Sequence, residues 1–134
     1  MILRLLLVVV TFAAVSGAVW LWRRPSRKLA HAHLDLEGWG VEGPAIVQFT
    51  ADWCAPCKAA KPHLEEAARA AEVTYSQVDV EAYPEVGHLY GIRSVPTIVV
   101  TDTHGHVLGH WTSLPANGEI RHAAEKARTE SVSA

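Results

Sequence analysis

The chain has 134 residues, of which 49% are hydrophobic and 19% are charged. This length leaves room for one compact domain of about 100 residues and an appendage, and it excludes a second domain of ordinary size. The net charge of −2 hides an asymmetry, because all 14 acidic residues but only seven of the 12 basic residues follow Leu34. The region after Leu34 has a formal charge of −7. This argues against a nucleic-acid partner, since no basic surface is left to neutralise phosphates.

The first 28 residues are predicted to form a membrane anchor and a basic stop segment. Residues 5–22 are apolar or small, and a helix of this length spans about 27 Å, close to the thickness of the hydrocarbon core of a bilayer. Trp20 and Trp22 stand where an interfacial aromatic belt is expected, and a basic cluster follows at residues 23–28. The alternative is a signal peptide cleaved after Ala18, but that site is followed by more apolar residues and by the basic cluster.

The charges that flank the apolar segment predict which side of the membrane the domain occupies. Four basic residues lie within residues 23–28, whereas Arg4 is the one charged side chain before them. The positive-inside rule therefore favours a single-pass protein with a cytoplasmic domain. The alternative, a domain outside the cytoplasm, applies if the partners are secreted thiol proteins.

The remaining chain alternates between predicted strands and helices. Residues 29–43 contain three glycines and are interpreted as a linker that leads into the fold. A domain is expected over residues 44–129, followed by a tail over residues 130–134. Apolar runs and alternation predict strands at 44–50, 73–80, 96–102 and 107–111, and helical spacing predicts helices at 55–71, 84–92 and 118–129.

This order of elements predicts an α/β fold with a central mixed β-sheet and helices on both faces. Only the passage from the first strand through a helix to the second strand requires a parallel crossover. The last two strands are joined closely enough to form an antiparallel hairpin.

Cys54 and Cys57 are the only two cysteines, and they lie where the first predicted strand gives way to the helix at 55–71. A sulfur at the start of a helix lies beside unpaired backbone N–H groups and the positive end of the helix dipole, which favour thiolate over thiol. Cys54 is therefore the predicted nucleophile. Cys57 lies about one turn further along the helix and is predicted to resolve a mixed disulfide formed at Cys54.

Three other uses of the two cysteines have less support in the sequence. Covalent haem attachment requires a histidine directly after the second cysteine, and Lys58 occupies that position. A zinc site requires two more ligands, and the chain has no second Cys-x-x-Cys pair. A purely structural disulfide would close too short a loop to stabilise the fold much. A redox-active pair is the preferred interpretation, and neither a metal nor a cofactor is expected.

Two segments, FTADWCAPCKAAKPHLEE at residues 49–66 and YGIRSVPTIVV at residues 90–100, resemble thioredoxin. The resemblance covers residues 36–128 and rests on the Trp-Cys-x-Pro-Cys-Lys motif, the helix proline Pro62 and the Val-Pro-Thr sequence. It implies a thioredoxin-like three-layer fold, a cis bond before the proline of Val-Pro-Thr, and a substrate peptide bound beside the cysteines. The substrate-binding residues that it implies are Trp53, Pro56, Val95, Pro96 and Thr97.

The chain departs from the thioredoxin pattern beside the cysteines. Thioredoxins have a buried acid six residues before the nucleophile that accepts the proton of the resolving thiol, and Gln48 occupies this position. An amide does not take up that proton, so deprotonation of Cys57 is expected to depend on water, Lys58 or a group of the substrate. Gln48 and Lys58 are therefore the residues expected to tune the pKa of the thiols.

The predicted function is that of a membrane-anchored thiol-disulfide oxidoreductase that reduces or exchanges protein disulfides. Its expected partners are protein disulfides or dithiols, an external dithiol or reductase that donates electrons, and the membrane, through residues 5–22. Three alternatives stay open: a binding or chaperone module with incidental thiols, an extracytoplasmic thiol reductase for the maturation of cytochromes or metal sites, and the delivery of copper or haem.

Overall fold

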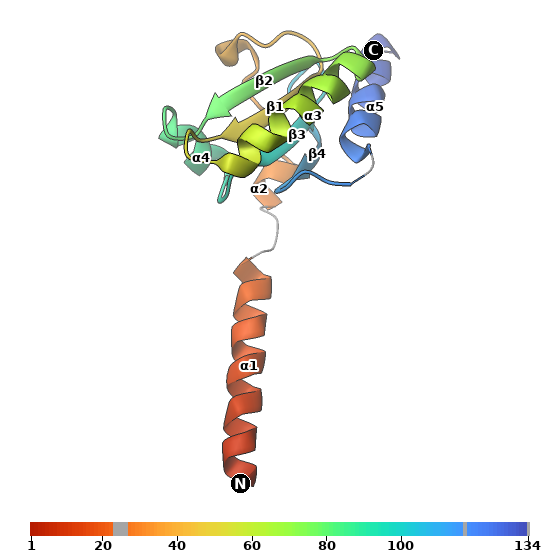
Figure 1. Cartoon of the computed structure of the whole chain (residues 1–134). Helices are drawn as coiled ribbons and strands as arrows, with labels where there is room; N and C mark the ends of the chain where they lie inside the picture. The colour runs from red at the N-terminus through yellow and green to blue at the C-terminus, as the bar shows by residue number, and fades with distance from the viewer. Residues whose placement is uncertain (23–26, 117, 134) are drawn as a thin grey trace.

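The computed structural model of the chain describes residues 1–22, 27–116 and 118–133. A long N-terminal helix precedes a domain built on a four-stranded sheet (Figure 1). The elements in chain order are α1 (Ile2–Trp22), α2 (Arg27–Ala30), the 3-10 helix η1 (Glu37–Trp39), β1 (Ala45–Thr50), α3 (Ala55–Ala71), β2 (Thr74–Asp79), α4 (Pro84–Tyr90), β3 (Thr97–Thr101), β4 (Val107–Trp111) and α5 (Glu119–Ser133).

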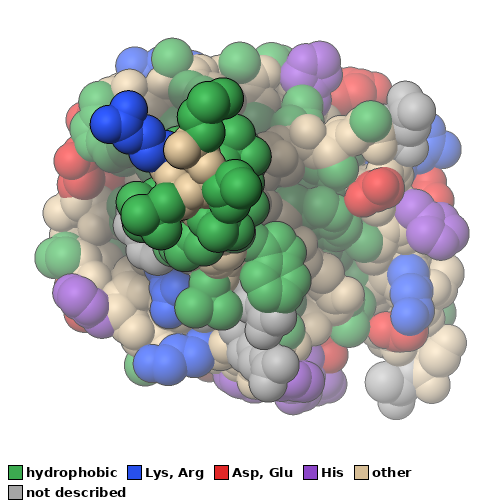
Figure 2. All heavy atoms as spheres, turned by 90° about the horizontal axis from the view of Figure 1, so that it is seen from below, with side chains coloured by type: hydrophobic (Ala, Val, Ile, Leu, Met, Phe, Trp, Pro, Cys, Tyr) green, Lys and Arg blue, Asp and Glu red, His purple; other side chains and the backbone are tan. Residues whose placement is uncertain are grey.

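α1 has the length and composition of a membrane span. The stretch Ile2–Leu21 is apolar enough to cross a bilayer, and none of it is buried against the rest of the chain. Figure 1 shows α1 extending away from the domain, and Figure 2, which looks along this helix, shows apolar side chains around it. A signal sequence near an N-terminus has the same length and composition. Residues 23–26, part of the predicted basic stop segment, lie outside the described residues.

The sheet is mixed, with the strand order β2-β1-β3-β4. β1 pairs with β2 in parallel, so that Gln48 lies opposite Gln77. β1 pairs with β3 in antiparallel fashion, and β3 and β4 form an antiparallel hairpin. The sequence-based topology is therefore confirmed, including the parallel pair joined by α3 and the hairpin near the C-terminus.

α3 and α5 cover one face of the sheet. Alternate side chains of the two central strands, including Ile46 of β1 and Ile98 of β3, pack against apolar side chains of both helices. α3 continues through Pro62 and is largely lined by alanine on its buried side, so it lies close to the sheet. The buried helix residues in this layer are Ala60, Leu64, Ala68, Ala71, Ile120, Ala124 and Ala127.

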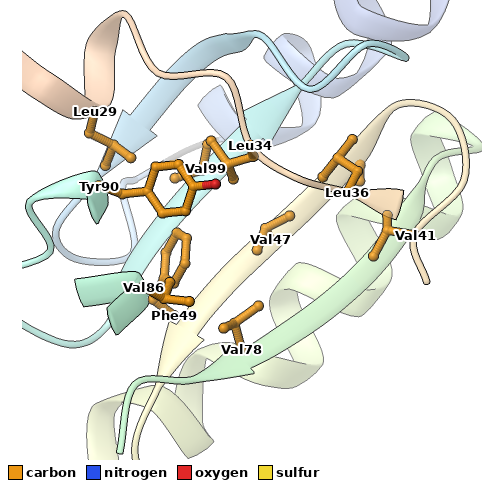
Figure 3. Close-up of a cluster of buried hydrophobic side chains, with 11 residues drawn as sticks. Leu29, Leu34, Leu36, Val41, Val47, Phe49, Val78, Val86, Tyr90 and Val99 are labelled. Atoms are coloured by element: carbon orange, nitrogen blue, oxygen red, sulfur yellow. The ribbon is translucent and has the colours of Figure 1, made fainter. Parts of the chain in front are cut away.

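The segment before β1 and α4 cover the opposite face (Figure 3). Phe49 of β1 is fully buried in this layer, and the Trp39 ring packs edge to face against Phe49 and Tyr90. Four side chains of the segment that was expected to be a linker are buried here as well, so this segment belongs to the core. They are Leu29, Leu34, Leu36 and Val41.

Several element boundaries differ from those expected, and two of these differences have an identified physical reason. α5 extends to Ser133, beyond the predicted helix end at Thr129. The Thr103 hydroxyl donates a hydrogen bond to the Ser131 hydroxyl (2.6 Å), which connects this last part of α5 to the turn after β3. β3 begins at Thr97 rather than at Pro96, because a proline has no N–H to donate to a sheet ladder.

The turn between β3 and β4 fixes the segment before β1. The Leu34 N–H donates to the Gly105 carbonyl (2.8 Å). The Asp102 carboxylate accepts hydrogen bonds from the backbone of His104 and from the backbone and ring of His106. Burial works to raise the pKa of Asp102, but the hydrogen bonds from His106 and His104 outweigh it and lower this pKa. Gly105 has a φ of +85°, and a Cβ built there would lie 2.2 Å from the Leu34 carbonyl oxygen.

The substitution Gly105→Ala is expected to destabilise the protein by about 2–4 kcal/mol, because it adds backbone strain and pushes the Leu34 segment off the turn. Urea unfolding of the full chain in detergent micelles measures this loss.

Gly43→Ala is the matched control, because Gly43 has a φ of +75° but no atom within 4 Å of its built Cβ. In this variant the free energy of unfolding is expected to fall by about 1–2 kcal/mol, the cost of the backbone strain alone. Equal losses in the two variants would contradict the role assigned to the contact between Gly105 and Leu34.

Candidate functional site

The two cysteines lie at the N-terminal end of α3, directly after β1. Cys54 is the N-cap of α3, and its N–H donates to the Ala51 carbonyl (3.0 Å), which closes the turn between strand and helix. Pro56 lies in the first turn of α3, where a missing N–H removes no helical hydrogen bond. Both sulfurs therefore lie at the start of the helix, where the sequence predicted them.

Cys54 and Cys57 are joined by a disulfide with an S–S distance of 2.07 Å. The Cys54 sulfur also accepts a hydrogen bond from the Cys57 N–H (3.2 Å), which is one of the backbone donors that has no partner within the helix. After reduction, this donor and the helix dipole favour a negative charge on Cys54. The two cysteines are 2% and 1% exposed, so water reaches little of either sulfur.

The loop before β3 lies against the disulfide. The Val95–Pro96 peptide bond is cis, as the resemblance implied. Val95 packs against the cluster formed by the cysteines and Ala51, and in the described residues its N–H and carbonyl have no protein hydrogen-bond partner. Pro96 and Thr97 are buried, and the Thr97 hydroxyl donates to the Ser94 carbonyl (2.7 Å). The Val95 backbone therefore has one donor and one acceptor left for a further hydrogen-bond partner.

Trp53 lies just before Cys54 with its side chain on the surface. It is 70% exposed, and its indole N–H donates to the Glu81 carboxylate (2.8 Å). Glu81 follows β2, in a turn whose Glu81 and Ala82 N–H groups donate to the Asp79 carboxylate. The loop after β2 thus holds the Trp53 ring by one end while its apolar face stays accessible.

Gln48 lies in the interior behind Cys57. Its side chain is fully buried, and its amide N–H donates to the Cys57 carbonyl (2.9 Å). Its amide oxygen accepts hydrogen bonds from the Tyr75 hydroxyl and from the Gln77 amide (3.2 Å). Burial, with the negative charge of Glu65 adding to it, raises the pKa of Tyr75 above the ordinary value for a phenol. An uncharged hydrogen-bond network therefore lies behind Cys57.

The structure separates Lys58 from Gln48, although both were predicted to tune the thiols. The Lys58 side chain is exposed, and the Lys58 backbone N–H donates to the Cys54 carbonyl (3.3 Å). Pro56 is exposed beside the disulfide.

Over residues 1–22, 27–116 and 118–133, no group of three or more histidine, cysteine, aspartate or glutamate side chains is arranged to hold a metal ion.

Tyr75, Gln77 and Glu81 belong to the site but were not predicted from the sequence. Alternation in the second predicted strand places Tyr75 and Gln77 on one face, so a correct register for β1 and β2 would have brought them beside Gln48. Glu81 contacts Trp53 through a loop, and no sequence pattern indicates that contact.

Comparison with known proteins agrees with this site. The thioredoxin family model matches residues 38–122, which is more than half of the chain. A thioredoxin of Rhodospirillum rubrum is 37% identical over 62 residues, which cover 45% of this chain and 60% of the relative. A putative thioredoxin 2 of Streptomyces coelicolor is 37% identical over 71 residues, which cover 52% of this chain and 53% of the relative. The matched region thus spans less than two thirds of either relative.

Solved structures show the same fold. Thioredoxin 1 of Thermosipho africanus superposes with a TM-score of 0.56 at 22% identity, covering 66% of this chain and 98% of that one. A mutant thioredoxin of Halobacterium salinarum superposes with a TM-score of 0.57 at 26% identity, covering 64% of this chain and 75% of that one. With a matching family model, a Cys-x-x-Cys disulfide at the start of α3 and a cis proline beside it, the chain belongs to the thioredoxin family.

Proposed function

We propose that this protein is a membrane-anchored thiol-disulfide oxidoreductase. The observation that supports this most is the hydrogen bond from the Cys57 N–H to the Cys54 sulfur at the start of α3, because a donor at that place stabilises a thiolate. The second sulfur lies within bonding distance of the first, which supports a two-step exchange.

The exchange proceeds through a mixed disulfide. The Cys54 thiolate attacks one sulfur of a substrate disulfide, and the other substrate sulfur leaves as a thiolate that takes a proton from water. Cys57 then loses its proton and attacks the Cys54 sulfur as a thiolate, the bond between Cys54 and the substrate breaks, and the released substrate sulfur takes up a proton. The substrate gains two electrons, and the dithiol of this protein becomes a disulfide. An external dithiol or reductase restores the reduced form.

The proposed substrates are extended segments of proteins that contain a disulfide. The backbone of Val95, next to Pro96, offers its N–H and carbonyl to such a segment, as an exposed strand edge would. Trp53 and Pro56, which precede and follow Cys54 in the chain, present exposed apolar surface, and the Thr97 hydroxyl supports the loop that contains Val95. Run in reverse, the same site transfers its disulfide to a dithiol, so the reduction potentials of the partners set the direction.

The anchor is proposed to be α1, because Ile2–Leu21 is long and apolar and remains exposed along its length. The basic residues that follow it favour a cytoplasmic domain. A domain outside the cytoplasm would instead favour a role in the maturation of secreted proteins or cytochromes.

Cys54→Ser is expected to lower turnover in a protein-disulfide reduction assay by about 10³-fold or more, because the nucleophile is lost. Cys57→Ser is expected to perform the first step and then stop, because no thiol resolves the intermediate. Mass spectrometry without reducing agent measures the mixed disulfide that accumulates in this variant.

Ala70→Ser, on the exposed side of α3, is the control for introducing a serine into this helix and is expected to leave turnover within about twofold. Absence of turnover in the unaltered protein, with retained peptide binding, would instead identify a binding module. A mixed disulfide formed through Cys57 in the Cys54→Ser variant would reverse the assigned roles.

The membrane topology is tested with two single-cysteine reporters in a chain that carries Cys54→Ser and Cys57→Ser. Val132→Cys lies near the end of α5 and Ile2→Cys at the start of α1, at positions that are 81% and 80% exposed. An impermeant maleimide applied to intact cells is expected to label the Ile2→Cys variant and not the Val132→Cys variant. The Val132→Cys variant is expected to be labelled only after the cells are lysed.

The reverse labelling pattern would place the domain outside the cytoplasm. A mature protein that lacks the Ile2→Cys reporter by mass would identify a cleaved signal peptide and contradict the anchor.

A further inference from the structure

The network behind Cys57 contains a tyrosine to which the exchange reaction has so far given no role. We propose that Tyr75 is a positioning residue for the second step of the exchange and that it acts through Gln48 on the backbone of Cys57. This inference rests on the proposed function and adds to it a chain of two hydrogen bonds, from Tyr75 to Gln48 and from Gln48 to Cys57.

Chemistry decides which way the Gln48 amide faces. The Cys57 carbonyl only accepts hydrogen bonds, so the NH₂ group of Gln48 has to face it. The oxygen of Gln48 then faces β2, where the Tyr75 hydroxyl and the Gln77 amide donate to it. Because burial raises the pKa of Tyr75, its hydroxyl keeps its proton throughout the physiological range and remains a donor.

The sheet gives these groups a fixed spacing. Tyr75 pairs with Ile46, and Gln77 pairs with Gln48, in the parallel register of β1 and β2. Ile46 packs against the buried side of α3, so Gln48, two residues along β1, points to the same face. Tyr75 is half-buried and packs against that layer, whereas Gln77 is exposed and its bond to Gln48 is longer. Tyr75 is therefore the stronger of the two anchors for the Gln48 amide.

The turn of α3 that contains Cys57 receives support from outside the helix. Pro62 lies inside α3 and lacks the N–H that would bond to the Lys58 carbonyl. The hydrogen bond from Gln48 holds the carbonyl of Cys57, which directly precedes Lys58 in the chain. In the second step the Cys57 sulfur must reach the Cys54 sulfur while the substrate is attached, and a fixed Cys57 backbone keeps it within reach.

The test separates the two steps of the exchange. The full chain is first reduced with an excess of a dithiol, which is then removed, and is mixed with a peptide disulfide. The reaction is quenched with acid, and the mixed disulfide and the released thiols are quantified against time. Tyr75→Phe removes one hydroxyl and is expected to slow decay of the mixed disulfide by about fivefold, while formation of the mixed disulfide changes by less than about twofold.

Tyr90→Phe is the matched control. It removes the same atom from a buried tyrosine on the opposite face of the sheet, where the hydroxyl accepts a hydrogen bond from the Asp35 N–H (3.2 Å). In this variant the rates of both steps are expected to stay within about twofold of those of the unaltered protein, even if urea unfolding shows it to be as destabilised as Tyr75→Phe. An equal slowing of the second step in the two variants would reduce Tyr75 to a general structural role and overturn the proposal.

A double-substitution cycle tests whether Tyr75 acts through Gln48. Gln48→Met keeps the size of the side chain and removes the amide, and it is expected to slow the second step at least as much as Tyr75→Phe. Adding Tyr75→Phe to Gln48→Met is expected to change that rate by less than about twofold, because Gln48→Met has already removed the amide through which Tyr75 acts on Cys57.

An unchanged second step in Gln48→Met, or a full additional slowing by Tyr75→Phe in that background, would overturn the proposal. These outcomes differ from a failure of the proposed function, in which the unaltered protein would form no mixed disulfide.

Discussion

α3 begins at Cys54, so the Cys57 N–H points at a sulfur instead of at a carbonyl oxygen. The proposed chemistry depends on this contact. A helix that started one residue earlier would place Cys54 inside its first turn and give the sulfur no backbone donor. The start is fixed from both sides, because the Ala51 carbonyl holds the Cys54 N–H and Pro56 is accommodated in the first turn.

β1 provides the rigid base for this helix start. Its side chains are buried on both faces of the sheet, with Ile46 under α3 and α5 and Phe49 under the segment before β1. Gln48 lies between these positions and is the one buried polar side chain of β1 that reaches α3. The strand at the centre of the core therefore also contacts the backbone of Cys57. The sheet, the helix start and the site are thus parts of one packed unit.

The fold and the cysteine pair could be predicted because their signals are local. Short apolar runs or alternating apolar residues mark β1 to β4, and Cys54 and Cys57 lie at a junction of strand and helix. The role of residues 29–41 could not be predicted, because their buried leucines are spaced irregularly and are placed by contacts with β1 and with Gly105. The contacts of Tyr75 with Gln48 and of Glu81 with Trp53 join distant parts of the chain, and only strand register and loop geometry bring them together.

The most direct test of the account is the alkylation rate of Cys54 as a function of pH. In the full chain with Cys57→Ser, the backbone N–H at position 57 is kept and Cys54 is the single thiol. We expect the midpoint of the rate profile to lie well below pH 8.5, the approximate pKa of an unperturbed cysteine, and to return to about that value when the protein is unfolded in urea. A folded protein whose midpoint lies at or above about 8.5 would contradict an activated nucleophile at the start of α3.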